Sequence, residues 1–330
     1  METIIAPATT PGELEAAIAP AVLYLESGQT VALPTETVYG LAADALNLDA
    51  VLKIFQTKER PLFDPLIVHL PTRTWLERIT NIPADDRTLV EKLANQFWPG
   101  PLTLVLPRQP IVPDIVTAGL DTVAVRMSAH PVFDQIVRAF GKPLAAPSAN
   151  RFGRISPTCA ADVMEELSGR VPMIVDGGRT THGIESTIVM VRNGAMILLR
   201  SGPVTPDELR RFGELTTSGP QAKMVAPGQL KSHYAPRTPL TLLAPDAEPQ
   251  WDGPGKAGLL AWCSADAAEG FAAVEVLSKS GSIREAAATL FQKLRSLDNS
   301  GLARIVAESV PEQGIGIAIM DRLRKASANG

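Results

Sequence analysis

The fold of the first half of the chain is decided by the stretch Thr30–Gly40, which reads TVALPTETVYG. Its first four residues are apolar or β-branched, as is typical of a short buried strand, and Pro34 ends that strand because proline has no backbone N–H. The polar loop that follows therefore lies at the carboxyl end of a strand, where α/β sheets bind ligands. The alternative is a tight turn that is capped by its own side chains.

Helical and strand-like segments interleave on both sides of this stretch. Apolar residues at helical spacing predict helices between Thr10 and Gly28, over 49–56, and around 89–97 and 133–140. Short apolar runs predict strands, and the turn Asn193-Gly194 predicts a hairpin at the last of them. We therefore expect an α/β fold whose N-terminal domain has a twisted mixed sheet with flanking helices. The predicted strands are 66–70, 102–106, 122–127, 171–175, 188–191 and 196–199.

A smaller second domain is expected after a linker. Residues 213–239 contain Gly, Ser, Pro and Lys without a sustained apolar period, so they predict a linker between a domain over 1–212 and another over 240–330. In the second domain a helix begins at Ser282, with a capping box, among four strand-like runs. This alternation predicts a small Rossmann-like α/β domain. The runs are 240–243, 258–262, 274–276 and 304–307.

The composition excludes several classes of protein. The 330 residues carry a net charge of −4, so no overall positive field is present to hold nucleic acid by its phosphates. The two cysteines, Cys159 and Cys263, are too far apart to form a CxxC pattern, which excludes a disulfide framework and does not favour zinc. No apolar run approaches the roughly 18 residues of a membrane span. We expect a soluble, cytoplasmic protein without a membrane partner.

Lys58 and Arg60 form a cluster of positive charge in a proline-rich loop. Two cations at this spacing, next to Pro61 and Pro65, suit a polyanion such as a triphosphate. The alternative is a pair of charges that merely face solvent.

Two further ionisable residues occur in or at the end of apolar strands. Arg126 ends the run TVAVR, where a buried guanidinium must pair with a carboxylate, which could belong to a substrate or to a structural salt bridge. His69 lies inside the run LIVHL, where a core histidine that has its hydrogen bonds satisfied is the alternative to a ligand-binding one.

Small and hydroxyl residues recur at strand boundaries. Ala145–Asn150 combines small side chains, which let a ligand approach the backbone, with the polar groups of Ser148 and Asn150. The alternative is a cap followed by a turn. Ser156, Ser186 and Arg200 repeat the theme. No Walker A, GxSxG, Rossmann glycine or HExxH motif occurs, so a nucleophile supplied by the substrate is favoured.

The linker contains a second motif at residues 226–236. Lys231, His233 and Tyr234 stand nearly side by side there, whereas a flexible tether needs only Gly, Ser or Pro. A lid over a site explains this composition, and an interdomain strap is the alternative.

Taken in order, these segments resemble the threonylcarbamoyl-AMP synthase family, whose catalytic part is the YrdC-like domain. The resemblance covers about residues 18–211, and the linker motif with the C-terminal segment resembles the long form of the family. Each motif alone is weak, whereas the ordered set is specific. The motifs are PTETVYGL (34–41), KxR (58–60), PLIVH (65–69), WPGPLT (98–103), TVAVR (122–126), SxN (148–150) and ESTI (185–188).

The resemblance implies an enzyme, a nucleotidyltransferase. It would join L-threonine, bicarbonate or CO2, and ATP into threonylcarbamoyl-AMP and pyrophosphate, with Mg²⁺ accompanying the ATP. The product would pass to the complex that forms N6-threonylcarbamoyladenosine in ANN-decoding tRNAs, and direct tRNA binding would be weak or absent.

The resemblance also assigns residues to the two substrates. No residue is assigned as catalytic, and none as a metal ligand. The residues implied for ATP are Lys58, Arg60, Leu62, Thr122, Ser148, Asn150, Ser156, Arg200 and Tyr234. The residues implied for threonine are Thr35, His69, Arg126, Ala146, through its backbone, and Ser186.

Two other functions remain as alternatives. A carbamoyl-transfer module of the hydrogenase-maturation type shares the YrdC-like domain, but it is expected together with acylphosphatase and zinc-finger segments, which this sequence does not contain. A non-enzymatic module that binds double-stranded RNA would use a concave basic surface, which the net charge of −4 does not favour.

Overall fold

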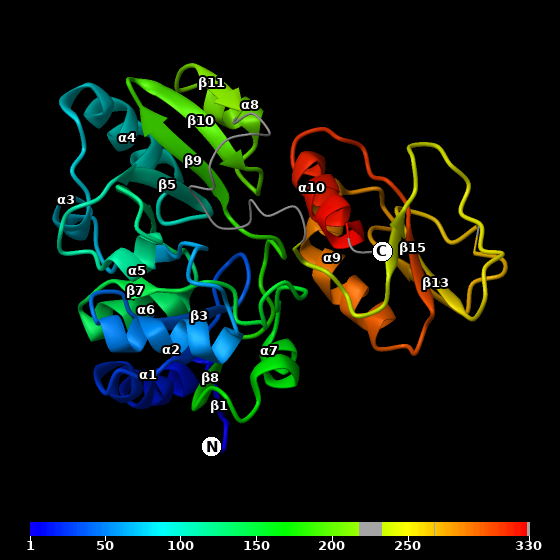
Figure 1. Ribbon diagram of the computed structural model, residues 1–330, viewed down its shortest axis with the longest axis horizontal. Coiled ribbons are helices and arrows are strands. Elements are labelled where there is room, and N and C mark those ends of the chain that lie inside the picture. The colour runs from blue at the N-terminus through cyan, green and yellow to red at the C-terminus, as the bar shows by residue number, and fades with distance from the viewer. Residues whose placement is uncertain (218–232, 267, 329–330) are drawn as a thin grey trace.

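The computed structural model describes residues 1–217, 233–266 and 268–328 and places them in two α/β domains that lie side by side (Figure 1). Within these residues, eleven strands form one mixed sheet in the first domain. In spatial order they are β1 (Ile4–Pro7), β8 (Met173–Asp176), β2 (Val31–Leu33), β3 (Gly40–Asp44), β7 (Leu144–Ala145), β4 (Ile67–His69), β6 (Thr122–Arg126), β5 (Leu102–Pro107), β9 (Thr187–Arg192), β10 (Ala195–Arg200) and β11 (Leu215–Thr217).

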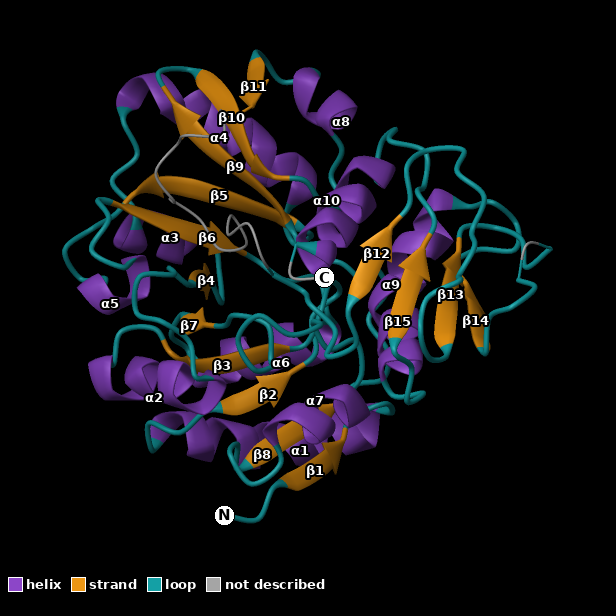
Figure 2. Ribbon diagram, turned by 45° about the vertical axis from the view of Figure 1, so that its right-hand side comes forward, coloured by secondary structure: helices purple, strands orange, loops and turns teal. Residues whose placement is uncertain are grey.

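Helices flank this sheet, as Figure 2 shows. The α1 helix begins at the predicted position after Thr10, which forms a capping box with Glu13, and packs its buried face, with Ala21 and Leu25, against the sheet and α6. The helices of the first domain are α1 (Pro11–Glu26), α2 (Leu48–Lys58), α3 (Thr74–Ile79), α4 (Ala84–Phe97), α5 (Asp114–Thr117), α6 (Pro131–Phe140), α7 (Ala160–Leu167) and α8 (Pro206–Arg210).

The register of the sheet brings the motifs together. The parallel pair β4 and β6 places His69 directly opposite Arg126, so the ends of both strands present polar side chains at one edge. The β2 strand ends at Leu33, and its loop returns as the antiparallel strand β3 from Gly40. Because the loop is this short, Thr35 and Thr37 stay beside the same edge of the sheet.

Over the part of the chain that the structure describes, the second domain is a four-stranded parallel sheet with two helices. Its strands, in spatial order, are β12 (Leu240–Leu242), β15 (Arg304–Ala307), β13 (Ala257–Ala261) and β14 (Ala273–Val276). The helices α9 (Ile283–Asp298) and α10 (Gly316–Ser327) lie on the side of this sheet that faces the first domain (Figure 1). The predicted α/β class of both domains is confirmed, and the first sheet reaches to β11, beyond residue 212.

Polar contacts tie the two domains together. Arg295 of α9 donates to the backbone oxygen of Ile155 at 2.9 Å and forms ion pairs with Glu165 and Glu166, both at 3.2 Å. Gly183 packs so closely on α9 that a Cβ atom there would lie 2.4 Å from the backbone oxygen of Ala288. The docking therefore depends on backbone fit as well as on charge.

Some elements differ from the prediction. The structure also contains β1, β3 and α10, which the sequence did not predict. The reason for β3 is its sequence, GLAAD, which lacks the β-branched residues that usually indicate a strand. Among the helices of the described residues, none combines the length and the apolar character that crossing a membrane requires.

We predict that Gly183→Ala loosens the docking of the two domains. Gly183 has a φ of +68°, where an L-residue costs about 1–2 kcal/mol, and its new methyl group would also meet the backbone of Ala288. The control is Gly141→Ala at the end of α6, which has a φ of +75° but open space around the Cβ position. In thermal unfolding, Gly183→Ala should lose more stability than Gly141→Ala, by roughly 1–3 kcal/mol, because overpacking costs about this much. Equal losses would contradict the close fit.

Candidate functional site

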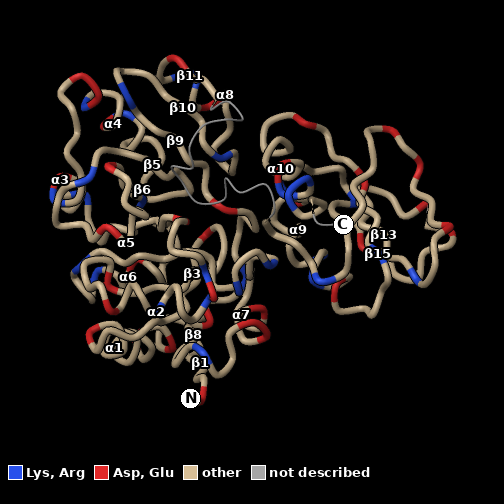
Figure 3. Tube along the Cα trace, in the orientation of Figure 1, with Lys and Arg blue, Asp and Glu red and all other residues tan. Residues whose placement is uncertain are grey.

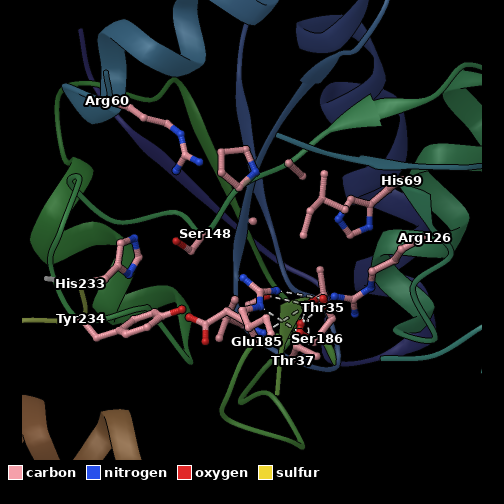
Figure 4. Close-up of a pocket in the computed structure, with 16 residues that line it drawn as sticks. Thr35, Thr37, Arg60, His69, Arg126, Ser148, Glu185, Ser186, His233 and Tyr234 are labelled. Atoms are coloured by element: carbon pink, nitrogen blue, oxygen red, sulfur yellow. Dashed lines mark hydrogen bonds between the residues drawn. The ribbon is translucent and has the colours of Figure 1, made fainter. Parts of the chain in front are cut away.

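A pocket lies where the ends of β2, β4, β6 and β7 meet the segment before β9, and Figure 4 shows the side chains around it. Arg60, His233 and Tyr234 lie on one side of this pocket, and His69 and Arg126 lie on the opposite side (Figure 4). The lining residues are Thr35, Thr37, Val38, Gly40, Arg60, Ile67, His69, Arg126, Ala146, Pro147, Ser148, Glu185, Ser186, Arg200, His233 and Tyr234.

Arg126 is buried and held by an acid from the polar loop. Its Nη2 donates to Oε1 of Glu36 at 2.6 Å and its Nη1 donates to the hydroxyl of Thr37 at 3.1 Å. Ser128 donates to the other oxygen of Glu36 at 2.5 Å. Nε of Arg126 has no hydrogen-bond partner among the described residues, so the guanidinium forms a structural ion pair and keeps one donor available.

Burial and charge oppose each other at Glu36. Burial raises the pKa of this carboxyl, but the Arg126 guanidinium and the Ser128 hydroxyl together hold the pKa below its usual value. Glu36 is therefore ionised, and it fixes the orientation of Arg126 at the pocket wall.

His69 is the neutral group at this end of the pocket. Its ring centroid is 4.6 Å from that of Phe133, and its Nδ1 has no hydrogen-bond partner among the described residues. Burial, with the nearby positive charge of Arg126, lowers the pKa of His69 to about 3. A neutral imidazole beside a guanidinium lets this end accept an anion and a polar group without a second positive charge.

Hydroxyl groups complete the same end. The Thr35 hydroxyl donates to the backbone oxygen of Val38 at 2.6 Å, which closes the polar loop as a side-chain-capped turn. Ser186 accepts from Nη2 of Arg200 at 3.0 Å and shares a hydrogen bond with Thr103 at 2.8 Å. The polar loop is therefore a turn that is capped by its own side chains, and it also lines a pocket at the carboxyl end of a strand.

The opposite end of the pocket contains buried cations. Arg60 forms an ion pair with Asp64 at 2.8 Å, and Lys58 donates from Nζ to the backbone oxygens of Ser148 and Asn150, both at 2.5 Å. Burial, together with the positive charge of Arg60, holds the pKa of Lys58 well below its usual value. Neither cation faces solvent, so the solvated-pair alternative does not hold.

Glu185 and Arg200 join the two ends. Arg200 donates from Nε to the backbone oxygen of Ser186 at 3.0 Å, and Glu185 accepts from the Ser156 hydroxyl at 2.5 Å. Burial raises the pKa of Glu185, but Arg322 and Arg200 hold the pKa below its usual value. The pocket is thus lined by cations and by the ionised Glu185, while the ionised Glu36 supports Arg126 from behind, and each of these carboxylates already has a cationic partner.

The structure brings most of the predicted site residues to this pocket. Lys58, Asn150 and Ser156 are buried but do not line it. Lys58 and Ser156 donate to the lining residues Ser148 and Glu185, and Asn150 accepts from Lys58 through its backbone oxygen. Leu62 and Thr122 do not line it: Leu62 is exposed, and Thr122 begins β6, at the opposite end of that strand from Arg126, where it lines a separate cavity. The predicted residues that line the pocket are Thr35, Arg60, His69, Arg126, Ala146, Ser148, Ser186, Arg200 and Tyr234.

Several lining residues were not among the predicted site residues. Glu185 is one of them, and Glu36 lies next to the wall as the partner of Arg126. Both lie inside the motifs that identified the family, but acids were not expected beside the sites for two anionic substrates. The signal was available, since a buried arginine such as Arg126 needs an anionic partner. Of the linker motif, residues 226–232 lie outside the described residues, whereas His233 and Tyr234 line the pocket.

Within the described residues, no group of three or more His, Cys, Asp and Glu side chains is placed to hold a metal ion. Nor do the lining residues include a nucleophile paired with an activating base. The pocket can bind, orient and stabilise charge, and the reacting groups would have to come from its ligands.

Two family models cover nearly the whole chain. The model described as "Telomere recombination" matches residues 23–202, and the model described as "Threonylcarbamoyl-AMP synthase, C-terminal domain" matches residues 204–328. The first begins near the end of α1 and ends just after β10, and the second covers α8 and β11 together with the small parallel sheet and its helices.

Similar proteins agree with these models. The threonylcarbamoyl-AMP synthase of Pyrococcus abyssi (strain GE5 / Orsay) is 40% identical over 324 residues, which cover 92% of each chain. That of Bacillus subtilis (strain 168) is 40% identical over 94% of this chain and 92% of its own. The crystal structure of P. abyssi Sua5 complexed with L-threonine has a TM-score of 0.88 at 37% identity and covers 99% of this chain and 98% of that one. The family and the fold predicted from the ordered motifs are confirmed.

We predict that His69 stays neutral throughout the physiological pH range. Its pKa of about 3 means that the folded protein carries the uncharged imidazole at every pH above roughly 4. Two-dimensional NMR of the histidine ring, assigned with a His69→Asn variant, should show no titration of the His69 signal between pH 8 and pH 5. A midpoint near 6.5, the value of an unperturbed histidine, would contradict the buried environment.

Proposed function

This chain belongs to the threonylcarbamoyl-AMP synthase family, and we propose that its pocket joins L-threonine, bicarbonate or CO2, and ATP into threonylcarbamoyl-AMP and pyrophosphate. The observation that carries the proposal is the division of one pocket into two ends. Arg126 and the neutral His69 stand at one end with Ser186, and Arg60 and Tyr234 stand at the other; Arg200 donates to Ser186 and connects the two ends. Two ligands that bind at these ends would meet in the middle.

Threonine binds at the end formed by β4 and β6. Its carboxylate pairs with Arg126, whose Nε is not used by the described residues. The hydroxyls of Thr35 and Ser186 line the same region and offer hydrogen bonds to the amino acid. Because Glu36 already holds the guanidinium, the arginine is oriented before threonine arrives, which lowers the entropy cost of binding.

ATP binds at the end formed by the KxR loop. Its phosphates displace Asp64 as the partner of Arg60 and approach the small residues that precede Ser148, where the chain leaves β7. Lys58 stands behind this wall, and its bonds to two backbone oxygens hold the wall in shape. His233 and Tyr234 face the same end from the linker.

The reaction needs no protein nucleophile. The amine of threonine adds to CO2 and loses a proton, which gives a carbamate; a carbamate oxygen then attacks the α-phosphorus of ATP as the bond to pyrophosphate breaks. Arg200 and Arg60, which are both buried, lie where negative charge develops on the phosphates. Positioning of the two substrates supplies the rest of the rate enhancement.

Mg²⁺ enters with ATP as part of the substrate. Glu185, which lines the pocket, and Glu36, which lies next to it, have cationic partners in Arg322 and Arg126, so they do not fit the role of metal ligands. Oxygens of the phosphates and water molecules would hold the ion, which is the usual mode for Mg²⁺ on a nucleotide, and the ion would neutralise charge on the phosphates.

His233 and Tyr234 support the proposed lid. Both are buried against the pocket, and the His233 ring contacts Phe152 and Tyr234 edge-on, with centroid distances of 6.0 and 4.2 Å. A mixed anhydride hydrolyses in water, so a cover made of aromatic groups protects the product. The remainder of the predicted lid, 226–232, lies outside the described residues.

The product would pass to the complex that transfers the threonylcarbamoyl group to tRNA. Basic and acidic residues are interspersed along the trace of both domains (Figure 3), and the net charge is −4. This distribution does not favour strong direct binding of tRNA. The cytoplasmic location stays a prediction.

The match of residues 204–328 to a threonylcarbamoyl-AMP synthase domain favours this function over the two alternatives. A carbamoyl-transfer module would need carbamoyl phosphate, and an RNA-binding module would release no pyrophosphate. We expect ATP-derived pyrophosphate release that requires both L-threonine and bicarbonate. Release without threonine, or release only with carbamoyl phosphate, would overturn the proposal. The assay uses the full chain and γ-labelled ATP, with L-alanine replacing threonine as the control.

We predict that substitutions at the two ends of the pocket impair the use of different substrates. Arg126→Ala should raise the KM for threonine or lower kcat by roughly 30- to 1,000-fold, since one charge-assisted pair contributes about 2–4 kcal/mol. Arg60→Ala should weaken a non-hydrolysable ATP analogue far more than threonine, as measured by calorimetry. The control is Arg138→Ala, which removes a half-exposed ion pair with Asp134 on α6.

Arg126→Ala leaves Glu36 buried without its partner, which can destabilise the fold. The double variant Glu36→Gln/Arg126→Ala removes that orphaned charge. It should regain thermal stability without regaining threonine use. An unchanged KM for threonine together with an unchanged kcat in either variant would contradict the assignment of threonine to this end of the pocket.

A further inference from the structure

The second domain contacts the wall of the pocket at several points. Phe291 stacks on Tyr234 with ring centroids 5.5 Å apart, and the backbone oxygen of Lys325 accepts from the backbone N–H of His233. Arg322 of α10 also reaches across to the first domain, and its side chain is fully buried. Its Nη1 donates to the backbone oxygen of Ser201 at 2.7 Å, and Asp321 lies 3.1 Å from the same nitrogen. An arginine that is buried this completely at a domain boundary must have anionic partners on the other side.

Both other neighbours of Arg322 line the pocket. Its Nε donates to Oε2 of Glu185 at 3.2 Å, and its guanidinium carbon lies 5.4 Å from the centroid of the Tyr234 ring. Glu185 and Tyr234 come from different segments of the chain, the turn before β9 and the linker. Arg322 therefore contacts two parts of the pocket wall that come from different segments of the chain.

The negative charge of Glu185 is unfavourable in a site for a polyanion. It is ionised, since Arg322 and Arg200 hold its pKa below the usual value despite burial. An unpaired carboxylate beside the nucleotide would repel the phosphates strongly, because charges interact strongly away from water. Arg322 neutralises this carboxylate from the side that faces away from the pocket.

We propose that Arg322 is a positioning residue of the active site, through which the C-terminal domain holds Glu185 and Tyr234 in the arrangement that accepts the nucleotide. The proposal rests on the proposed function, because it concerns the nucleotide end of that pocket. It also gives the second domain a role in substrate binding rather than in stability alone. The guanidinium acts through the two pocket residues and does not itself line the pocket.

Arg295 provides a natural comparison inside the same interface. It is also a buried arginine of the second domain, with ion pairs to Glu165 and Glu166 and a hydrogen bond to Ile155. None of these three partners lines the pocket. If domain docking alone mattered for the nucleotide, the loss of Arg295 and the loss of Arg322 would have the same effect.

The experiment measures the affinity of the full chain for a non-hydrolysable ATP analogue by calorimetry, without threonine or bicarbonate. Arg322→Met should weaken the analogue on the order of tenfold or more, within the usual coupling between contacting charges. The KM for threonine should change by less than about threefold, because Arg126 and His69 lie at the other end. Arg295→Met should lower the unfolding temperature but leave the affinity for the analogue within about threefold.

A second substitution distinguishes the loss of charge compensation at Glu185 from general damage to the fold. In Glu185→Gln/Arg322→Met no unpaired carboxylate remains, so the affinity for the analogue should return close to that of Glu185→Gln alone. Arg322→Lys, which keeps the positive charge, should retain more affinity than Arg322→Met. If Arg322→Met does not fold, the double variant measured against Glu185→Gln carries the test by itself.

Three results would overturn the proposal. Arg322→Met could bind the analogue as the wild type does, the double variant could bind as weakly as Arg322→Met, or Arg295→Met could lose as much affinity as Arg322→Met. Failure of the proposed function gives a different result, namely that the wild type binds the analogue but releases no threonine-dependent pyrophosphate. A wild type that does not bind the analogue would overturn both.

Discussion

The structure depends on the compensation of buried positive charge. Lys58, Arg60, Arg126 and Arg200 surround one pocket with almost no access to water, which would be costly without partners. Each partner has a separate origin: two backbone oxygens for Lys58, Asp64 for Arg60, Glu36 for Arg126, and the Ser186 backbone for Arg200. These partners hold the cations in place before any substrate arrives, and an anionic substrate can replace or join them.

The buried positive charge is compensated in different ways at the two ends of the pocket. Glu36 is fixed by Ser128 and is part of a short capped loop, so it orients Arg126 permanently and leaves Nε for a ligand. Asp64 is buried too, but neither of its carboxylate oxygens accepts a hydrogen bond within the described residues, so the carboxylate contributes an ion pair alone. Arg60 is also held by the backbone oxygens of Asp64 and Pro65, to which it donates at 3.2 and 2.9 Å. Burial raises the pKa of Asp64, and the nearby charges of Arg60 and Lys58 oppose this shift. The carboxylate at the Arg126 end of the pocket is thus itself fixed by hydrogen bonds, whereas the carboxylate at the Arg60 end is not.

The sequence predicted those parts of the site that depend on local pattern. An arginine at the end of an apolar strand and a histidine in the neighbouring strand pointed to an edge of the sheet, and the parallel register of β4 and β6 places them opposite each other. The acids were missed because their partners are distant in sequence: Glu36 meets Arg126, and Glu185 meets Arg322 on a helix that apolar spacing did not reveal. Thr122 was placed near the nucleotide by resemblance, but a strand of five residues carries it away from the pocket edge at Arg126. Local pattern predicts which residues end a strand, whereas charge compensation across domains requires the fold.

The most direct test of this account asks which atoms become bonded in the pocket. The full chain is supplied with ATP, L-threonine and ¹³C-bicarbonate, and the fresh reaction is followed by ³¹P and ¹³C NMR. A substrate-made carbamate that attacks the α-phosphorus predicts pyrophosphate together with a nucleotide whose α-phosphorus is coupled to the labelled carbon through one oxygen. ADP with inorganic phosphate, or AMP that forms without any phosphorus-coupled ¹³C signal, would contradict it.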